Sequence, residues 1–103
     1  AGASWMAEYG NPDTEDWEYI KLWSPYQNLS PDKEYPKVYY WTNTRDDRVH
    51  PAHARKMVAR LQEFGKLVYY YENTEGGHGG GTNPNQRAYT SALSYAYLWK
   101  MLR

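Results

Sequence analysis

The sequence has no cysteine among its 103 residues, which excludes disulfide bonds and thiolate metal ligands. The compartment is left open, because reducing and oxidising environments both accept cysteine-free chains; a bacterial cytoplasm or periplasm is the expectation. No apolar run approaches the roughly 20 residues of a membrane-spanning helix, and no succession of basic, apolar and small residues marks a signal peptide. We therefore expect no membrane partner.

An excess of charge of either sign is also missing, since 12 Lys and Arg residues balance 12 Asp and Glu residues. Without a basic surplus the chain lacks the electrostatic footprint of a nucleic-acid-binding protein, so we expect no nucleic-acid partner.

Phenylalanine occurs once, whereas there are 12 tyrosines and 5 tryptophans. Such rings, apolar with a polar tip, suit half-wet pockets and interfaces.

Secondary-structure signals are concentrated after residue 36. Residues 1–36 are rich in Gly and Pro turns and predict a loop-rich segment with one short helix over 14–22. Beyond it, β-branched and aromatic runs predict strands, and apolar residues at helical spacing predict helices. The expected elements are a strand at 37–42, a helix at 51–64, a strand at 66–71 and a helix from 83 to the end.

This alternation predicts an α/β fold in which two parallel strands are joined by a right-handed crossover. Two strands are too few for an independently stable sheet, and both outer edges would offer unpaired backbone groups. We expect an incomplete sheet, completed by residues absent from this chain or by a second copy. The chain is then a single unit, with a pocket segment at 1–36 and a βαβα unit at 37–103.

Ionisable residues follow both predicted strands. Asp46 lies in the loop after the first strand, and His78 lies in EGGHGGG (residues 75–81), which holds five of the chain's eight glycines. Because parallel strands end at one edge, Asp46 and His78 should be neighbours, as in the acid–base half of a serine-hydrolase triad. The serine is missing: no G-x-S-x-G motif occurs, and Ser4 is interpreted as structural.

These motifs resemble those of the prolyl oligopeptidase family, at the C-terminal part of its α/β-hydrolase catalytic domain. The similar segments are GASWMAEYG (2–10), WSPY (23–26), DDRVHP (46–51) and EGGHG (75–79), with 32 positions from Asp46 to His78. The resemblance implies that Asp46 is the triad acid and His78 the general base. It implies that Arg48 binds a substrate carbonyl, and that Trp5, Tyr9 and Val49 line a proline-sized pocket.

The resemblance further implies a serine peptidase that cleaves short, proline-containing peptides on the carboxyl side of proline, without a cofactor. Family members carry the serine, further strands and an N-terminal β-propeller upstream, and none of these is in the 103 residues. The chain begins at Ala1 rather than Met. We therefore expect a C-terminal fragment that supplies the acid and the base of its parent polypeptide and is inert alone.

Three other interpretations stay open from the residues alone. The chain could be a non-catalytic α/β module that self-associates or binds a partner to complete its sheet. His50, His53 and His78 could bind zinc, although the spacing is loose and no carboxylate is placed as a fourth ligand; no metal is expected. The glycine loop could cradle phosphate at the last helix, although it matches neither G-x-G-x-x-G nor a Walker motif.

Overall fold

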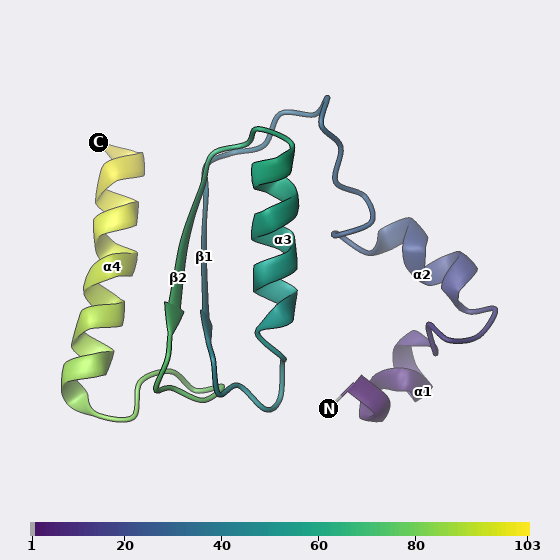
Figure 1. The fold of residues 1–103 in the computed structure, drawn as a ribbon, viewed down its shortest axis with the longest axis horizontal. Coiled ribbons are helices and arrows are strands. Elements are labelled where there is room, and N and C mark those ends of the chain that lie inside the picture. The colour runs from purple at the N-terminus through teal and green to yellow at the C-terminus, as the bar shows by residue number, and fades with distance from the viewer. Residues whose placement is uncertain (1) are drawn as a thin grey trace.

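The computed structural model describes residues 2–103, in which a small α/β unit is preceded by a helical N-terminal segment (Figure 1). In chain order the elements are η1 (Gly2–Trp5, a 3₁₀ helix), α1 (Met6–Tyr9), α2 (Trp17–Trp23), β1 (Val38–Asn43), α3 (Ala52–Glu63), β2 (Val68–Asn73) and α4 (Pro84–Leu102). The predicted mixed α/β class and the order β–α–β–α are confirmed. They are consistent with the C-terminal portion of an α/β-hydrolase fold.

β1 and β2 pair in parallel, with Val38 opposite Val68 and Asn43 opposite Asn73. Both strands extend beyond their predicted ends at residues 42 and 71, because polar residues at a strand end can still pair through the backbone. Within residues 2–103 these two strands make up the whole sheet. The register brings the carboxyl ends of both strands to one edge, where the two loops of interest begin.

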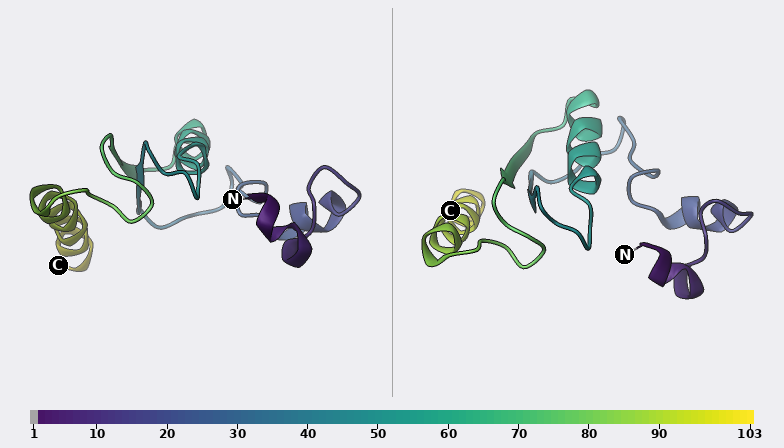
Figure 2. Two further views of the ribbon diagram at one scale, coloured as in Figure 1. Left: turned by 90° about the horizontal axis from the view of Figure 1, so that it is seen from below. Right: turned by 60° about the horizontal axis from the view of Figure 1, so that its bottom comes forward.

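α3 covers one face of the sheet, and α4 lies on the other (Figures 1 and 2). The apolar stripe of α3 is directed at the sheet, and Val58 and Leu61 are the buried residues of this helix. The helix ends where Gly65 adopts a φ of 73°, which residues with a Cβ rarely adopt. The apolar core is therefore thin and lies mainly under α3.

α4 begins with a well-formed cap, since the Asn83 side chain accepts a hydrogen bond from the Gln86 N–H at 2.9 Å and Pro84 occupies the first turn. Tyr97 fixes the helix on the sheet: its ring lies 5.5 Å from that of Tyr39, and its hydroxyl donates to the Lys37 carbonyl at 2.6 Å. No helix within residues 2–103 combines the length and apolarity needed to cross a membrane.

The outer side of α4 exposes large apolar side chains. Tyr95 is 71% exposed, Trp99 70% and Leu102 82%. A 19-residue helix of a finished domain normally buries a wider apolar stripe than this one does.

The N-terminal segment lies on the far side of α3 from the sheet (Figures 1 and 2). The prediction of a loop at its start was wrong, because η1 and α1 form there, and α2 begins three residues later than the predicted helix. Gly10, with a φ of 94°, ends α1, and the Asn11 N–H donates to Asp16 Oδ2 at 3.0 Å. Four-residue helices held by such local bonds leave almost no apolar periodicity to detect.

Candidate active site

Asp46 and His78 meet at the carboxyl edge of the sheet. Asp46 lies in the loop between β1 and α3, and His78 in the loop between β2 and α4. The Nδ1 atom of His78 is 2.9 Å from Asp46 Oδ2 and 3.1 Å from Oδ1. Residues 32 positions apart are thus in hydrogen-bond contact, as the parallel strand order led us to expect.

The Asp46 carboxylate is held by its own loop. Oδ1 accepts backbone N–H groups of Val49 at 2.9 Å and Arg48 at 3.0 Å, and the side chain is 9% exposed. The Val49 N–H is the main cause that lowers the pKa of Asp46, and His78 and the Arg48 N–H add to it, while burial opposes them. Asp46 is therefore an ionised acceptor at neutral pH.

The second ring nitrogen of His78, Nε2, is left open by the contact with Asp46. Because Nδ1 faces an ionised carboxylate, Nδ1 carries the proton in the neutral ring, and Nε2 is then the basic atom. The side chain is 45% exposed, and within residues 2–103 no hydrogen bond occupies Nε2. A tight turn presents the ring: Gly77 and Gly80 form an isolated bridge, and the Gly80 N–H donates to the Gly77 carbonyl at 3.1 Å.

At Gly76 the loop that carries His78 packs closely against two buried asparagines. Asn43 and Asn73, which face each other in the register, are 2% and 6% exposed. A Cβ at Gly76 would lie 2.6 Å from Asn43 Oδ1, 2.8 Å from Asn73 Nδ2 and 2.5 Å from the Gly80 carbonyl oxygen. These two amide atoms find no hydrogen-bond partner within residues 2–103. The loop backbone can approach this closely because residue 76 has no side chain.

A cavity of about 390 Å³ opens beside the Asp46–His78 pair. Its walls come from β1 and the start of α3 as well as from the two loops, and Val49, one of the predicted pocket residues, lines it at 48% exposure. The cavity walls are mostly apolar with the charged pair at one side, a common property of ligand sites.

The other predicted site residues are not brought to this cavity. Trp5 and Tyr9 are 51% and 53% exposed, and their rings form a tilted contact with centres 5.8 Å apart, in the N-terminal segment (Figure 1). Arg48 is exposed and contributes its backbone N–H to Asp46. Within residues 2–103 the structure therefore assembles Asp46, His78 and Val49, and leaves Trp5, Tyr9 and the Arg48 side chain apart.

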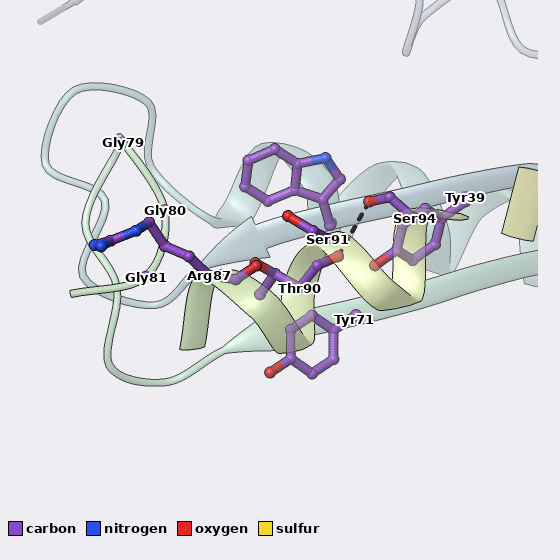
Figure 3. A pocket seen from close by; sticks show the side chains of 10 residues that line it. Tyr39, Tyr71, Gly79, Gly80, Gly81, Arg87, Thr90, Ser91 and Ser94 are labelled. Atoms are coloured by element: carbon purple, nitrogen blue, oxygen red, sulfur yellow. Dashed lines mark hydrogen bonds between the residues drawn. The ribbon is translucent and has the colours of Figure 1, made fainter. Parts of the chain in front are cut away.

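A second cavity, of about 270 Å³, lies between the sheet and the first half of α4 (Figure 3). Tyr39 and Tyr71 form its sheet side, while Arg87 and Ser91 come from the helix. The sequence did not single out this place, because its members are spread over two strands, a loop and a helix.

Metal ligation finds no support in the geometry. Among residues 2–103 no three His, Cys, Asp or Glu side chains are grouped so as to hold a metal ion. His50 instead accepts the Ala52 N–H at its Nδ1, at 3.0 Å, at the start of α3.

Sequence reasoning missed a carboxylate that connects β2 to the β1–α3 loop and to α3. Glu72, near the end of β2, accepts hydrogen bonds from Thr44 at 2.6 Å and from Arg55 at 2.8 and 2.6 Å. An acidic residue inside an otherwise aromatic strand was the available signal. Its partners depend on strand register, which the sequence does not state.

Glu72 should make stability depend on pH. Its contacts, first that with Arg55, lower its pKa from 4.5 to about 2. The ionised form therefore stabilises the fold fully above pH 4.5, and this contribution is lost as the pH falls toward about 2. Urea unfolding from pH 7 to 2 should show a difference between wild type and Glu72→Gln that shrinks across this window. A pH-independent difference would contradict the assignment, and Glu63→Gln, at a carboxylate 69% exposed, is the matched control.

Two parallel strands flanked by helices, with an aspartate and a histidine in contact at their carboxyl edge, are consistent with the C-terminal portion of an α/β-hydrolase fold. The chain belongs to the prolyl oligopeptidase family, whose model matches residues 2–103.

Several curated proteins are similar to the chain over nearly its whole length. The "Uncharacterized peptidase y4nA" of Sinorhizobium fredii is 46% identical over 103 residues, which cover 99% of this chain and 14% of that protein. A prolyl endopeptidase of Elizabethkingia miricola is 37% identical over 103 residues (93% of the chain, 15% of that protein). Prolyl oligopeptidase A of Galerina marginata is 33% identical over 106 residues (98% and 14%). The chain thus spans about one seventh of the length of these relatives.

Proposed function

We propose that the chain supplies the acid and the general base of a serine-peptidase triad, within a longer polypeptide that carries the nucleophile. The contact between His78 Nδ1 and Asp46 carries this proposal. His78 Nε2 takes the proton of the attacking serine hydroxyl, and Asp46 stabilises the imidazolium that forms. His78 then gives that proton to the leaving amine. The reaction needs no cofactor.

The proposed substrate is a short peptide cleaved on the carboxyl side of proline. The family indicates peptide substrates, and two of the relatives are named for prolyl activity. Val49, in the cavity wall, would contact the proline ring, and Trp5 and Tyr9 would complete the pocket when the N-terminal segment is held beside it. Arg48, whose side chain is exposed, would bind a substrate carbonyl.

The proposed partner is the remainder of the catalytic domain. Two observations support it: the sheet has two strands within residues 2–103, and α4 exposes Tyr95, Trp99 and Leu102. In this proposal residues 1–36 are the pocket segment and residues 37–103 the βαβα unit. The matched relatives are about seven times longer than the chain, which leaves ample polypeptide for further strands.

A second candidate is a non-catalytic module whose copies associate through the same surfaces. The exposed apolar side of α4 favours this alternative. Sedimentation that finds a well-folded monomer at micromolar concentration would count against self-association.

The direct test is hydrolysis of a proline-containing chromogenic peptide by the 103-residue chain and by the longer polypeptide. We expect turnover from the longer polypeptide and none from the chain, because a serine peptidase without its nucleophile loses about 10⁶-fold in kcat. Turnover by the chain that Asp46→Ala abolishes would contradict the expected inertness. An inactive longer polypeptide would contradict the proposed function.

A further inference from the structure

Glu72 connects three elements at the edge of the sheet that carries the site. Its carboxylate, 20% exposed, accepts Thr44 Oγ1 at 2.6 Å from the β1–α3 loop. It also accepts Arg55 Nε at 2.8 Å and Nη2 at 2.6 Å from α3, and the Tyr70 hydroxyl at 2.5 Å from β2. Charge-assisted bonds of this kind are short and strong, and a two-pronged Arg contact also fixes direction. Glu72 is therefore held from three sides.

Thr44 links Glu72 to the loop that carries Asp46. Its hydroxyl reaches Glu72, and its backbone N–H donates to the Asn73 carbonyl at 2.9 Å. Thr44 is thus bonded twice to β2, the strand that leads to the His78 loop, and it precedes Asp46 by two residues. A shift of the loop at Thr44 would move Asp46 relative to His78, and the 2.9 Å contact between them tolerates little displacement before it ceases to be a hydrogen bond.

We propose that Glu72 is a positioning residue that, through Thr44, holds Asp46 at hydrogen-bond distance from His78. Its effect on turnover rests on the proposed function, whereas its effect on the Asp46–His78 contact does not. The groups that face Glu72 are Arg55 on α3, Tyr70 on its own strand and Thr44 in the loop. Because these partners lower the pKa of Glu72 to about 2, the carboxylate stays charged throughout the neutral range.

The test compares Thr44→Val, which removes the hydroxyl at nearly constant shape, with Thr44→Ser, which keeps it. Glu72→Gln removes the charge at the acceptor, and Glu63→Gln is the control at an exposed carboxylate of α3. In ¹⁵N-histidine-labelled chain, the proton shared between His78 Nδ1 and Asp46 gives a low-field resonance. Steady-state kinetics on the longer polypeptide with a proline-containing chromogenic peptide give kcat and KM.

We expect the low-field resonance to be lost in Thr44→Val and Glu72→Gln and retained in Thr44→Ser and Glu63→Gln. In the longer polypeptide kcat should fall about 10- to 100-fold in the first two variants, while KM changes little, since misplacement of a catalytic group by about 1 Å has this effect. Thr44→Ser should restore kcat.

A resonance that persists in Thr44→Val overturns the positioning role, whatever the kinetics. A resonance that is lost while kcat stays at the wild-type value keeps the positioning role and overturns the proposed function instead. Should Glu72→Gln unfold the chain, as judged by the dispersion of its amide spectrum, the Thr44 pair decides, because Thr44 is exposed and its substitution opens no cavity.

Discussion

Replacing His78 by alanine should lower kcat of the proposed longer peptidase by about 10⁶-fold, and Asp46→Asn should lower it by about 10⁴-fold. The first substitution removes the base. The second keeps the shape of the side chain but removes the charge that fixes the ring, now 2.9 Å from Nδ1. Steady-state kinetics and labelling of the serine by a fluorophosphonate measure both effects.

Asp47→Asn is the matched control, because this neighbouring carboxylate is exposed and forms no ion pair within residues 2–103. It should leave kcat close to wild type. Fluorophosphonate labelling that survives intact in His78→Ala, or equal losses in Asp46→Asn and Asp47→Asn, would refute the assignment of base and acid.

Gly76→Ala should damage both the fold and the site. The new Cβ would lie 2.5 Å from the Gly80 carbonyl oxygen, which is backbone of the same loop, and 2.6 Å from Oδ1 of the buried Asn43, so the loop must change its conformation. Overpacking of this kind costs about 1–3 kcal/mol, and displacement of the loop by about 1 Å should lower kcat about 100-fold. Urea unfolding of the chain and kinetics on the longer polypeptide measure the two effects.

Gly79→Ala is the stability control, since a Cβ at Gly79 meets no atom within 4 Å and the residue has no positive φ. It should unfold at nearly the wild-type urea concentration. Equal stability losses in the two variants would show that the loss comes from reduced flexibility of the loop rather than from close packing of residue 76 against Asn43 and Asn73.

The sequence allowed the βαβα order to be predicted because each element carries a strong local pattern, such as the apolar spacing of α3 ended by Gly65. The contact of Asp46 with His78 was predictable for a different reason: parallel strands end at one edge, so topology alone makes their following loops neighbours. The catalytic roles of the two residues stay predictions.

Other features depend on information that a local pattern does not hold. The Glu72–Thr44 contact joins residues 28 positions apart and needs the strand register, and the demand for glycine at position 76 arises from side chains on two strands. The placement of Trp5 and Tyr9 depends on how an N-terminal segment with few contacts to the sheet lies against the rest, which short helices at 2–9 do not determine.

The strand register, in which Asn43 lies opposite Asn73, also determines whether Asp46 and His78 lie within hydrogen-bond distance. A slip of β2 by one residue along β1 would displace the His78 loop by about 3.3 Å, and a displacement of this size would break the hydrogen bond between His78 and Asp46. It would also turn Glu72 to the opposite face, toward α4 and away from Arg55. A misaligned chain would thus lose the contact between Asp46 and His78 and the contacts of Glu72 together, so a strand-pairing error during folding would remove the proposed site rather than weaken it.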